Sequence, residues 1–216
     1  MGTARGAPFL GSSGSRERPS PQAGEHDIVV VGAPAGAAQT ASMFLVGLPG
    51  AFTLPLVLLF GGAGGDDRGR LVSLQAHCAL PVRLIDDKDP ILSGRIHLAP
   101  ADYHLLVDGN HFALSTEGPV KGARPSIDVL FESVADAFGP RAVCVLLGRD
   151  EHAEGDGRAG AAKVRARGGL VIVENATTAA VGPQKGNDEA PLAAATMLHL
   201  SEIAPFVSTL GEMEVT

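Results

Sequence analysis

The sequence predicts an α/β fold: a doubly wound, mostly parallel sheet flanked by helices, with an inserted antiparallel β-hairpin. Short apolar runs rich in Val, Ile and Leu recur without polar interruption, which is typical of parallel strands covered on both faces. Helix-length segments alternate with these runs. In the middle of the chain apolar and polar residues alternate instead, and Asp108-Gly109 is a strong signal for a hairpin turn.

The strands of the sheet are predicted from the apolar runs. The first run, "IVVV" at residues 28–31, contains only β-branched residues, as expected for a central strand. Further buried strands are predicted at residues 54–60, 82–85, 142–147 and 170–173. The alternating segments are "GRIHLAP" and "YHLLVDGNHFALS", and the second contains the hairpin turn.

The helices are predicted from apolar spacing and capping residues. Residues 127–138 form the clearest one, because Ser126 suits an N-cap and Gly139 a C-terminal stop. A helix over residues 35–48 would carry one apolar stripe, formed by Ala38, Ala41, Leu45 and Leu48. Other helices are predicted at residues 71–78, 158–167, 191–199 and 201–210, and "GGAGGDDRGR" is predicted to be a polar loop.

The chain of 216 residues is predicted to hold one domain, residues 26–216, behind a disordered tail, residues 1–25. The tail is rich in Gly, Ser, Pro and Arg and shows no apolar core of a signal peptide. No charge occurs between Asp27 and Asp66, but glycines and prolines divide that stretch into pieces too short to insert into a membrane.

The net charge limits the partners that this protein could bind, and the cysteines indicate its cellular compartment. A formal net charge of −7 argues against binding to nucleic acid or to an anionic membrane. Cys78 and Cys144 form no metal-binding or redox pair and are predicted to be free thiols in a reducing compartment, which indicates a cytoplasmic protein.

The first strand runs into a turn of unusual composition, Gly32-Ala33-Pro34-Ala35-Gly36. These five residues fit the G-x-S-x-G frame of a hydrolase turn, but proline replaces the nucleophilic serine. A dinucleotide-binding turn would need glycine at Pro34 and Ala37, and no acidic residue follows the second strand to bind a ribose. The sequence therefore gives no support to a nucleotide cofactor.

Two groups of residues could be considered as metal ligands. His97, His104 and His111 lie in or beside the hairpin, but nothing in their spacing makes them converge, and we expect rim or surface histidines. A loop richer in ligand types contains Asp150, Glu151, His152, Glu154 and Asp156. A solvated acidic loop is the favoured interpretation, so neither a metal nor another cofactor is predicted.

Four segments, taken in order, resemble the chemotaxis receptor methylesterase family (the CheB-type methylesterase domain). They are "IVVVGAPAG", "LPVRLIDDKDPILSGRIHLAPADYHLLV", "RPSIDVLFESVADAFGPRAVCVLL" and "GDGRAGAAKVRARGGLVIVEN", and the likeness covers about residues 27–208. The resemblance implies a cytoplasmic α/β hydrolase that removes methyl groups from glutamate methyl esters on chemoreceptors.

The resemblance also implies a Ser-His-Asp triad at the carboxyl ends of the strands. The aspartate of the family matches Asp156, which precedes Gly157, whereas the serine falls at Pro34 and the histidine at Gly61. The Thr-Gly-Met turn of the family becomes Leu147-Gly148-Arg149, which puts its oxyanion donors in doubt. Ser42 stands about two turns, roughly 12 Å, along the next helix and cannot replace the nucleophile, and Thr40 is little better.

These substitutions predict a catalytically impaired methylesterase homologue that still binds. Its partner would be a chemoreceptor cytoplasmic domain, another signalling protein, or a ligand in the vacated cleft. Two alternatives stay open: an active protein-glutamate methylesterase, and a decayed gene product without a selected function. Release of methanol from methylated receptor would separate the first two of these three hypotheses.

Overall fold

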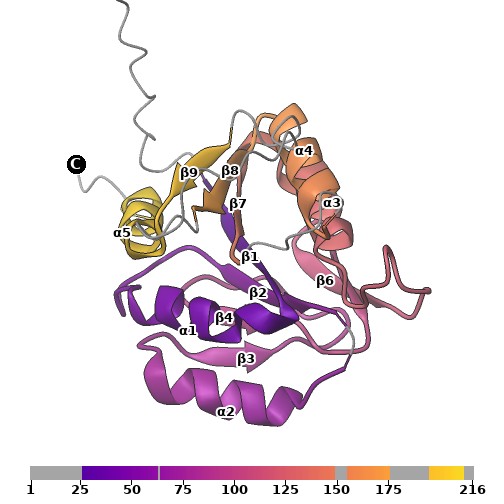
Figure 1. Cartoon of the computed structure of the whole chain (residues 1–216), viewed down its shortest axis with the longest axis horizontal. Coiled ribbons are helices and arrows are strands. Elements are labelled where there is room, and N and C mark those ends of the chain that lie inside the picture. The colour runs from indigo at the N-terminus through magenta and orange to yellow at the C-terminus, as the bar shows by residue number, and fades with distance from the viewer. Residues whose placement is uncertain (1–25, 63, 149–154, 176–194, 212–216) are drawn as a thin grey trace, which may run out of the picture.

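The computed structural model describes residues 26–62, 64–148, 155–175 and 195–211, and its centre is a seven-stranded sheet (Figure 1). The strand order is β3-β4-β2-β1-β7-β8-β9, and every neighbouring pair is parallel. The chain winds outward from β1 in both directions, so the predicted doubly wound parallel sheet is confirmed. The strands are β1 (Ile28–Pro34), β2 (Leu56–Gly61), β3 (Val82–Leu84), β4 (Ile96–Leu98), β7 (Ala142–Leu146), β8 (Leu170–Glu174) and β9 (Thr196–Leu198).

Helices cover both faces of the sheet and bury two separate apolar cores. Along β1, Val29 and Val31 contribute to one core, whereas Ile28 and Val30 contribute to the other, because successive side chains point to opposite faces. Helices α1 (Ala38–Val46), α2 (Asp67–His77) and α5 (Leu200–Leu210) pack on the first face, and α3 (Ile127–Phe138) and α4 (Arg158–Ala166) pack on the second (Figure 1). Two short 3₁₀ helices, η1 (Ala35–Ala37) and η2 (Gly139–Arg141), precede α1 and follow α3.

The predicted hairpin is confirmed as a separate two-stranded antiparallel sheet. Strand β5 (His104–Asp108) pairs with β6 (His111–Ser115), and Asp108 lies opposite His111. The two-residue turn is therefore Gly109-Asn110, in which Gly109 adopts the left-handed φ of 59°. Leu105, Val107 and Phe112 of this hairpin join the core under α3.

The structure corrects the predicted helices at three places. The helix after β1 begins with one 3₁₀ turn, η1, which shifts the apolar face of the helix. Ala37 is therefore buried, and Ala38, which the prediction placed on the apolar stripe, is exposed. Helix α2 begins four residues early, because the Asp66 carboxylate accepts a hydrogen bond from the Gly69 N–H at 3.0 Å and caps it. The helix predicted at 191–199 is wrong in its described part, since β9 pairs there with β8.

Two of the three histidines are buried rather than at the rim. His97 is 4% exposed and packs against the Phe112 ring, with Nε2 within hydrogen-bond distance of the Leu92 backbone. His104 is 1% exposed. Only His111 of the three is exposed, as predicted. Each buried ring is used within the fold, and no metal-binding group of three or more His, Cys, Asp or Glu occurs among the described residues.

Other predictions fall partly or wholly outside the described ranges. The predicted tail, residues 1–25, lies outside them, as do Asp150, Glu151, His152 and Glu154 of the acidic loop. Both cysteines are described and free, with Cys144 buried on β7 and Cys78 half-buried. Within the described ranges, no helix is long and apolar enough to cross a membrane.

Candidate functional site

The first two predicted site positions lie side by side at one edge of the sheet. Pro34 is the last residue of β1 and Gly61 the last of β2, and the parallel register places them opposite each other. Pro34 stands one residue before η1 with φ −61° and ψ 158°, so its ring fits the backbone without strain. The centre of this turn thus carries no hydroxyl.

The third predicted position, Asp156, reaches the same place from the loop before α4. A Cβ atom added to Gly61 would lie 3.2 Å from Asp156 Oδ2. The folded chain therefore brings Pro34, Gly61 and Asp156 together, although they are far apart in sequence.

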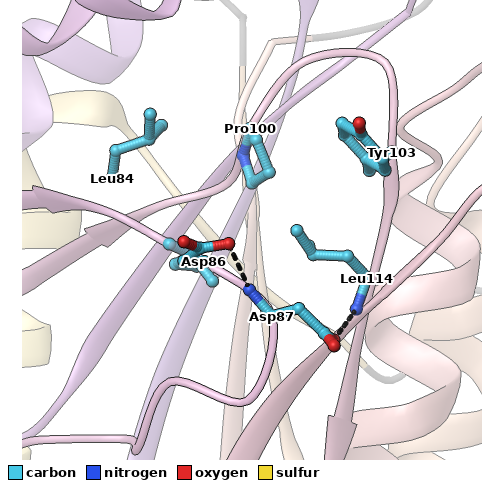
Figure 2. A pocket seen from close by; sticks show the side chains of 7 residues that line it. Leu84, Asp86, Asp87, Pro100, Tyr103 and Leu114 are labelled. Atoms are coloured by element: carbon cyan, nitrogen blue, oxygen red, sulfur yellow. Dashed lines mark hydrogen bonds between the residues drawn. The ribbon is translucent and has the colours of Figure 1, made fainter.

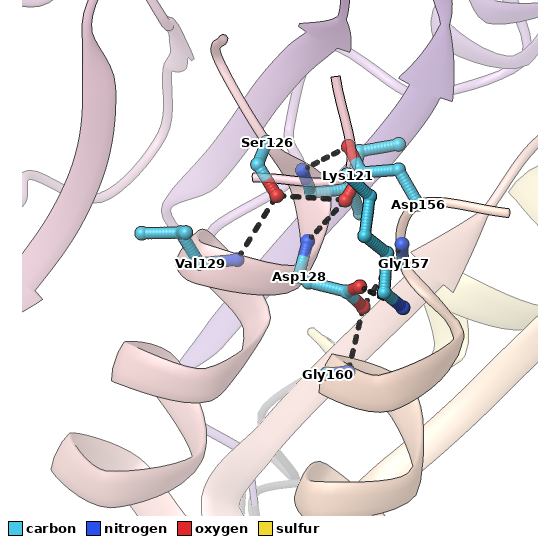
Figure 3. A network of polar contacts seen from close by, with 8 residues as sticks. Lys121, Ser126, Asp128, Val129, Asp156, Gly157 and Gly160 are labelled. Atoms are coloured by element: carbon cyan, nitrogen blue, oxygen red, sulfur yellow. Dashed lines mark hydrogen bonds and ion pairs between the residues drawn. The ribbon is translucent and has the colours of Figure 1, made fainter. Parts of the chain in front are cut away.

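The Asp156 carboxylate is already engaged by the start of α3 (Figure 3). Its Oδ1 accepts hydrogen bonds from the Ser126 hydroxyl at 2.7 Å and from the Asp128 N–H at 2.9 Å. Its Oδ2 accepts one from the Ile127 N–H at 2.6 Å. A carboxylate at a helix N-terminus satisfies N–H groups that have no partner in the helix and interacts favourably with the helix dipole. In this chain Asp156 caps α3.

Asp128 connects the two helices in the opposite direction, from α3 to the start of α4. The sequence did not predict this role for Asp128. It is 2% exposed, and its Oδ1 accepts from the Gly157 N–H at 2.9 Å and the Gly160 N–H at 2.8 Å, at the start of α4 (Figure 3). Its Oδ2 accepts from Lys121 Nζ at 2.9 Å, which neutralises the buried charge. An acidic residue in the first turn of a helix was the available signal.

The turn after β7 also differs from an oxyanion site. The Gly148 N–H donates to Glu174 Oε2 at 2.6 Å, from the end of β8. This turn lies against Pro34, because a Cβ atom on Gly148 would come 3.2 Å from Pro34 Cγ. A carboxylate that occupies a backbone donor here would repel the negative oxygen that forms during ester hydrolysis. Arg149, the third residue of this turn, lies outside the described residues.

Ser42 and Ser126 are each hydrogen-bonded within the fold and are not placed to serve as a nucleophile. Ser42 donates to the Ala38 carbonyl at 3.0 Å, within α1. Ser126 is fully buried and donates to Asp156, not to an imidazole. His104 Nδ1 accepts from the Ser126 backbone N–H at 3.3 Å, and its Nε2 lies 3.0 Å from the Gly118 carbonyl. The imidazole therefore contacts the backbones of Ser126 and Gly118.

A separate pocket of about 580 Å³ lies at the same edge of the sheet, at the end of β3 (Figure 2). Its walls include Leu84, Pro100, Tyr103 and Leu114. Asp86 and Asp87 also line it, but their carboxylates accept hydrogen bonds from neighbouring backbone N–H groups, those of Asp87 and Leu114. Because β4 stands between β3 and β2, this pocket is separate from the three predicted positions.

A solved structure shares this fold. The CheB methylesterase catalytic domain of Thermotoga maritima superposes with a TM-score of 0.73 and 25% sequence identity, over 86% of this chain and 98% of that chain. A relative from Leptospira interrogans is 31% identical over 157 residues, which are 72% of this chain and 80% of the relative.

Longer relatives match over a smaller share of their own length. The protein-glutamate methylesterase/protein-glutamine glutaminase 4 of Myxococcus xanthus is 33% identical over 71% of this chain and 43% of its own. The protein-glutamate methylesterase/protein-glutamine glutaminase 1 of Pseudomonas fluorescens is 34% identical over 91% of this chain and 58% of its own. The family model for the CheB methylesterase matches residues 29–207. This chain belongs to the CheB methylesterase family.

Proposed function

We propose that this chain is a catalytically impaired CheB-family protein that acts in the cytoplasm by binding a chemoreceptor or another signalling protein. One observation carries the proposal: residue 34, to which the family resemblance assigns the nucleophile, is proline, and proline has no group that can attack an ester. Gly61, at the position of the base, has no group that can accept a proton.

The surroundings of these two positions support the same proposal. Asp156 is engaged by three donors at the start of α3, and Glu174 holds the Gly148 N–H that borders Pro34. A triad aspartate instead orients an imidazole, and an oxyanion site keeps its donors open.

The second candidate function is an active protein-glutamate methylesterase. It is favoured by the similarity to the relatives from Myxococcus and Pseudomonas, which are named protein-glutamate methylesterases. This function would require a nucleophile and a base other than the residues at positions 34 and 61.

Release of methanol from a methylated chemoreceptor cytoplasmic domain tests the proposal. The Thermotoga catalytic domain serves as the reference enzyme, and a reaction without protein gives the background. We expect release at the background rate. Release clearly above background that persists after repurification would favour the second candidate function.

A binding experiment tests the other half of the proposal. The chain, immobilised on a surface, should retain methylated and unmethylated chemoreceptor cytoplasmic domains, or one of the two forms. Failure to bind either form would remove the receptor as partner, and failure to bind any signalling protein of the same organism would favour a decayed gene product.

A further inference from the structure

Ile127, the first residue of α3, occupies the space where three glycines meet. A Cβ atom added to Gly32 would lie 2.4 Å from Ile127 Cγ2, one added to Gly157 would lie 2.9 Å from the same atom, and one added to Gly61 would lie 3.2 Å from Cδ1 and from Cγ1. These glycines belong to β1, to β2 and to the loop before α4, so one fully buried side chain fills the junction between them.

The backbone of Ile127 restricts the same space from another side. Its N–H donates to Asp156 Oδ2 at 2.6 Å, and this oxygen is the other atom that a Cβ on Gly61 would meet at 3.2 Å. Asp156 cannot move aside without losing that bond. One neighbour that crowds position 61 is therefore the Ile127 side chain, and the other, Asp156 Oδ2, is bonded to the Ile127 backbone.

We infer that Ile127 limits which residue position 61 can hold, and that a side chain there, a histidine included, requires residue 127 to shift or to become smaller. The inference deepens the proposed function, because it makes the loss of the base a packed feature of the core and not an isolated substitution. A contact of 3.2 Å between carbon atoms is shorter than the optimal separation of about 3.5–4.0 Å.

The backbone at Gly61 does not explain the glycine by itself. Its φ lies outside the left-handed region, so an L-residue could adopt its conformation. The cost of a side chain at position 61 thus arises from its neighbours, and a coupling measurement between positions 61 and 127 can detect it.

The test is a double-mutant cycle on the full chain with thermal unfolding as the readout. Gly61→Ala in the wild-type background should lower Tm by about 2–10 °C, as overpacking of a core does in a domain of this size. In the Ile127→Val background, which removes Cδ1, the same change should lower Tm by less than half as much. The Ile127→Ala background, which also removes Cγ1, should reduce the shift further.

Gly36→Ala is the matched control. It lies in the same turn region, and a Cβ atom there meets nothing within 4 Å. This variant measures how replacing glycine with alanine lowers the conformational entropy of the unfolded chain, and its Tm shift should be the same in all three backgrounds. Equal Tm shifts for Gly61→Ala with isoleucine, valine and alanine at position 127, or no shift in the wild-type background, would overturn the inference. Esterase activity of the wild type would overturn the proposed function and leave this coupling unchanged.

Discussion

Asp156, just before α4, caps α3, and Asp128, in the first turn of α3, caps α4. Asp156, before α4, accepts from the N–H groups of Ile127 and Asp128 in α3. Asp128, in α3, accepts from the N–H groups of Gly157 and Gly160 at the start of α4. The two carboxylates fasten the starts of the two helices to each other (Figure 3). Asp156 also lies next to Gly61, which pairs with Pro34.

This reciprocal capping predicts that Asp156 now contributes to stability. Asp156→Ala should lower the free energy of unfolding by about 2–4 kcal/mol, because it removes a helix cap and leaves N–H groups of α3 without partners. Asp128→Ala should cost at least as much, since Asp128 is buried. Denaturant unfolding of both variants and of the double variant measures these values, and the double variant should lose less than the sum.

Asp108→Asn is the matched control for these two substitutions. Asp108 is exposed beside the hairpin turn, where asparagine is equally suitable, so its stability should change by less than about 0.5 kcal/mol. An Asp156→Ala variant as stable as this control would mean that the capping bonds contribute nothing in solution.

A second prediction concerns chemical labelling of the site. A fluorophosphonate probe should not label this chain, because it reacts with an activated serine and position 34 is proline. The Thermotoga catalytic domain is the positive control. Stoichiometric labelling of any serine, located by mass spectrometry, would show that the nucleophile had been misplaced.

The sequence predicted those parts of the fold that depend on local pattern. Ile28–Val31 had to be a central strand because a β-branched run without polar residues needs cover on both faces, and both cores include it. Ser126 and Gly139 marked the ends of α3 because each suits one end of a helix, and both lie at those ends.

Features that depend on contacts between distant segments could not be predicted in this way. Strand β9 is defined by its pairing with β8, which overrides the weak helical pattern of residues 195–199. His97 and His104 are buried because backbone groups of other segments satisfy their ring nitrogens. The role of Asp128 required knowing that α4 begins beside α3, which only the folded chain reveals.

A third prediction follows from the burial of His97. Desolvation by burial lowers the pKa of His97 below its ordinary value of 6.5, and repulsion from Arg95 lowers the pKa further. The hydrogen bond to the Leu92 backbone and the charge of Asp89 raise the pKa, but they do not reverse the shift. The folded state thus favours the neutral ring, whereas the unfolded state binds a proton below pH 6.5. The stability contributed by the neutral ring is present above pH 6.5 and is lost as the pH falls.

His97→Gln tests this pH dependence. The wild type should lose stability between pH 7.5 and pH 5.5, and the variant should lose less over the same interval. His111→Gln, at an exposed position, is the control and should keep the slope of the wild type. Equal slopes for all three proteins would show that His97 titrates alike in the folded and unfolded states.

The last prediction concerns repair of the proposed triad. Pro34→Ser alone should stay inactive, because a serine without a base is a poor nucleophile at neutral pH. Gly61→His alone should also stay inactive, having no hydroxyl to activate. The pair, Pro34→Ser with Gly61→His, supplies both groups beside Asp156, but the new histidine would crowd Ile127 Cδ1 and the Asp156 carboxylate. We expect little or no ester hydrolysis and a lowered Tm from this pair.

Adding Ile127→Val to the pair should raise both Tm and activity, because it gives the imidazole room next to the residue that would orient it. The activity should remain well below that of the Thermotoga domain. Glu174 still holds the Gly148 N–H, and loss of one oxyanion donor costs about 10²–10³ in rate. Hydrolysis of methylated receptor by each variant, measured as methanol release, gives the comparison.

Three outcomes of this repair would distinguish the position of the base, the crowding by Ile127 and the remaining defect. Activity of Pro34→Ser alone would mean that an unrecognised base lies nearby and that Gly61 is not its position. Activity of the pair that Ile127→Val does not improve would mean that Ile127 yields easily to a side chain at position 61. A stable, inactive triple variant would leave two defects to separate: the three hydrogen bonds that hold Asp156 to the start of α3, and the Gly148 N–H that Glu174 occupies.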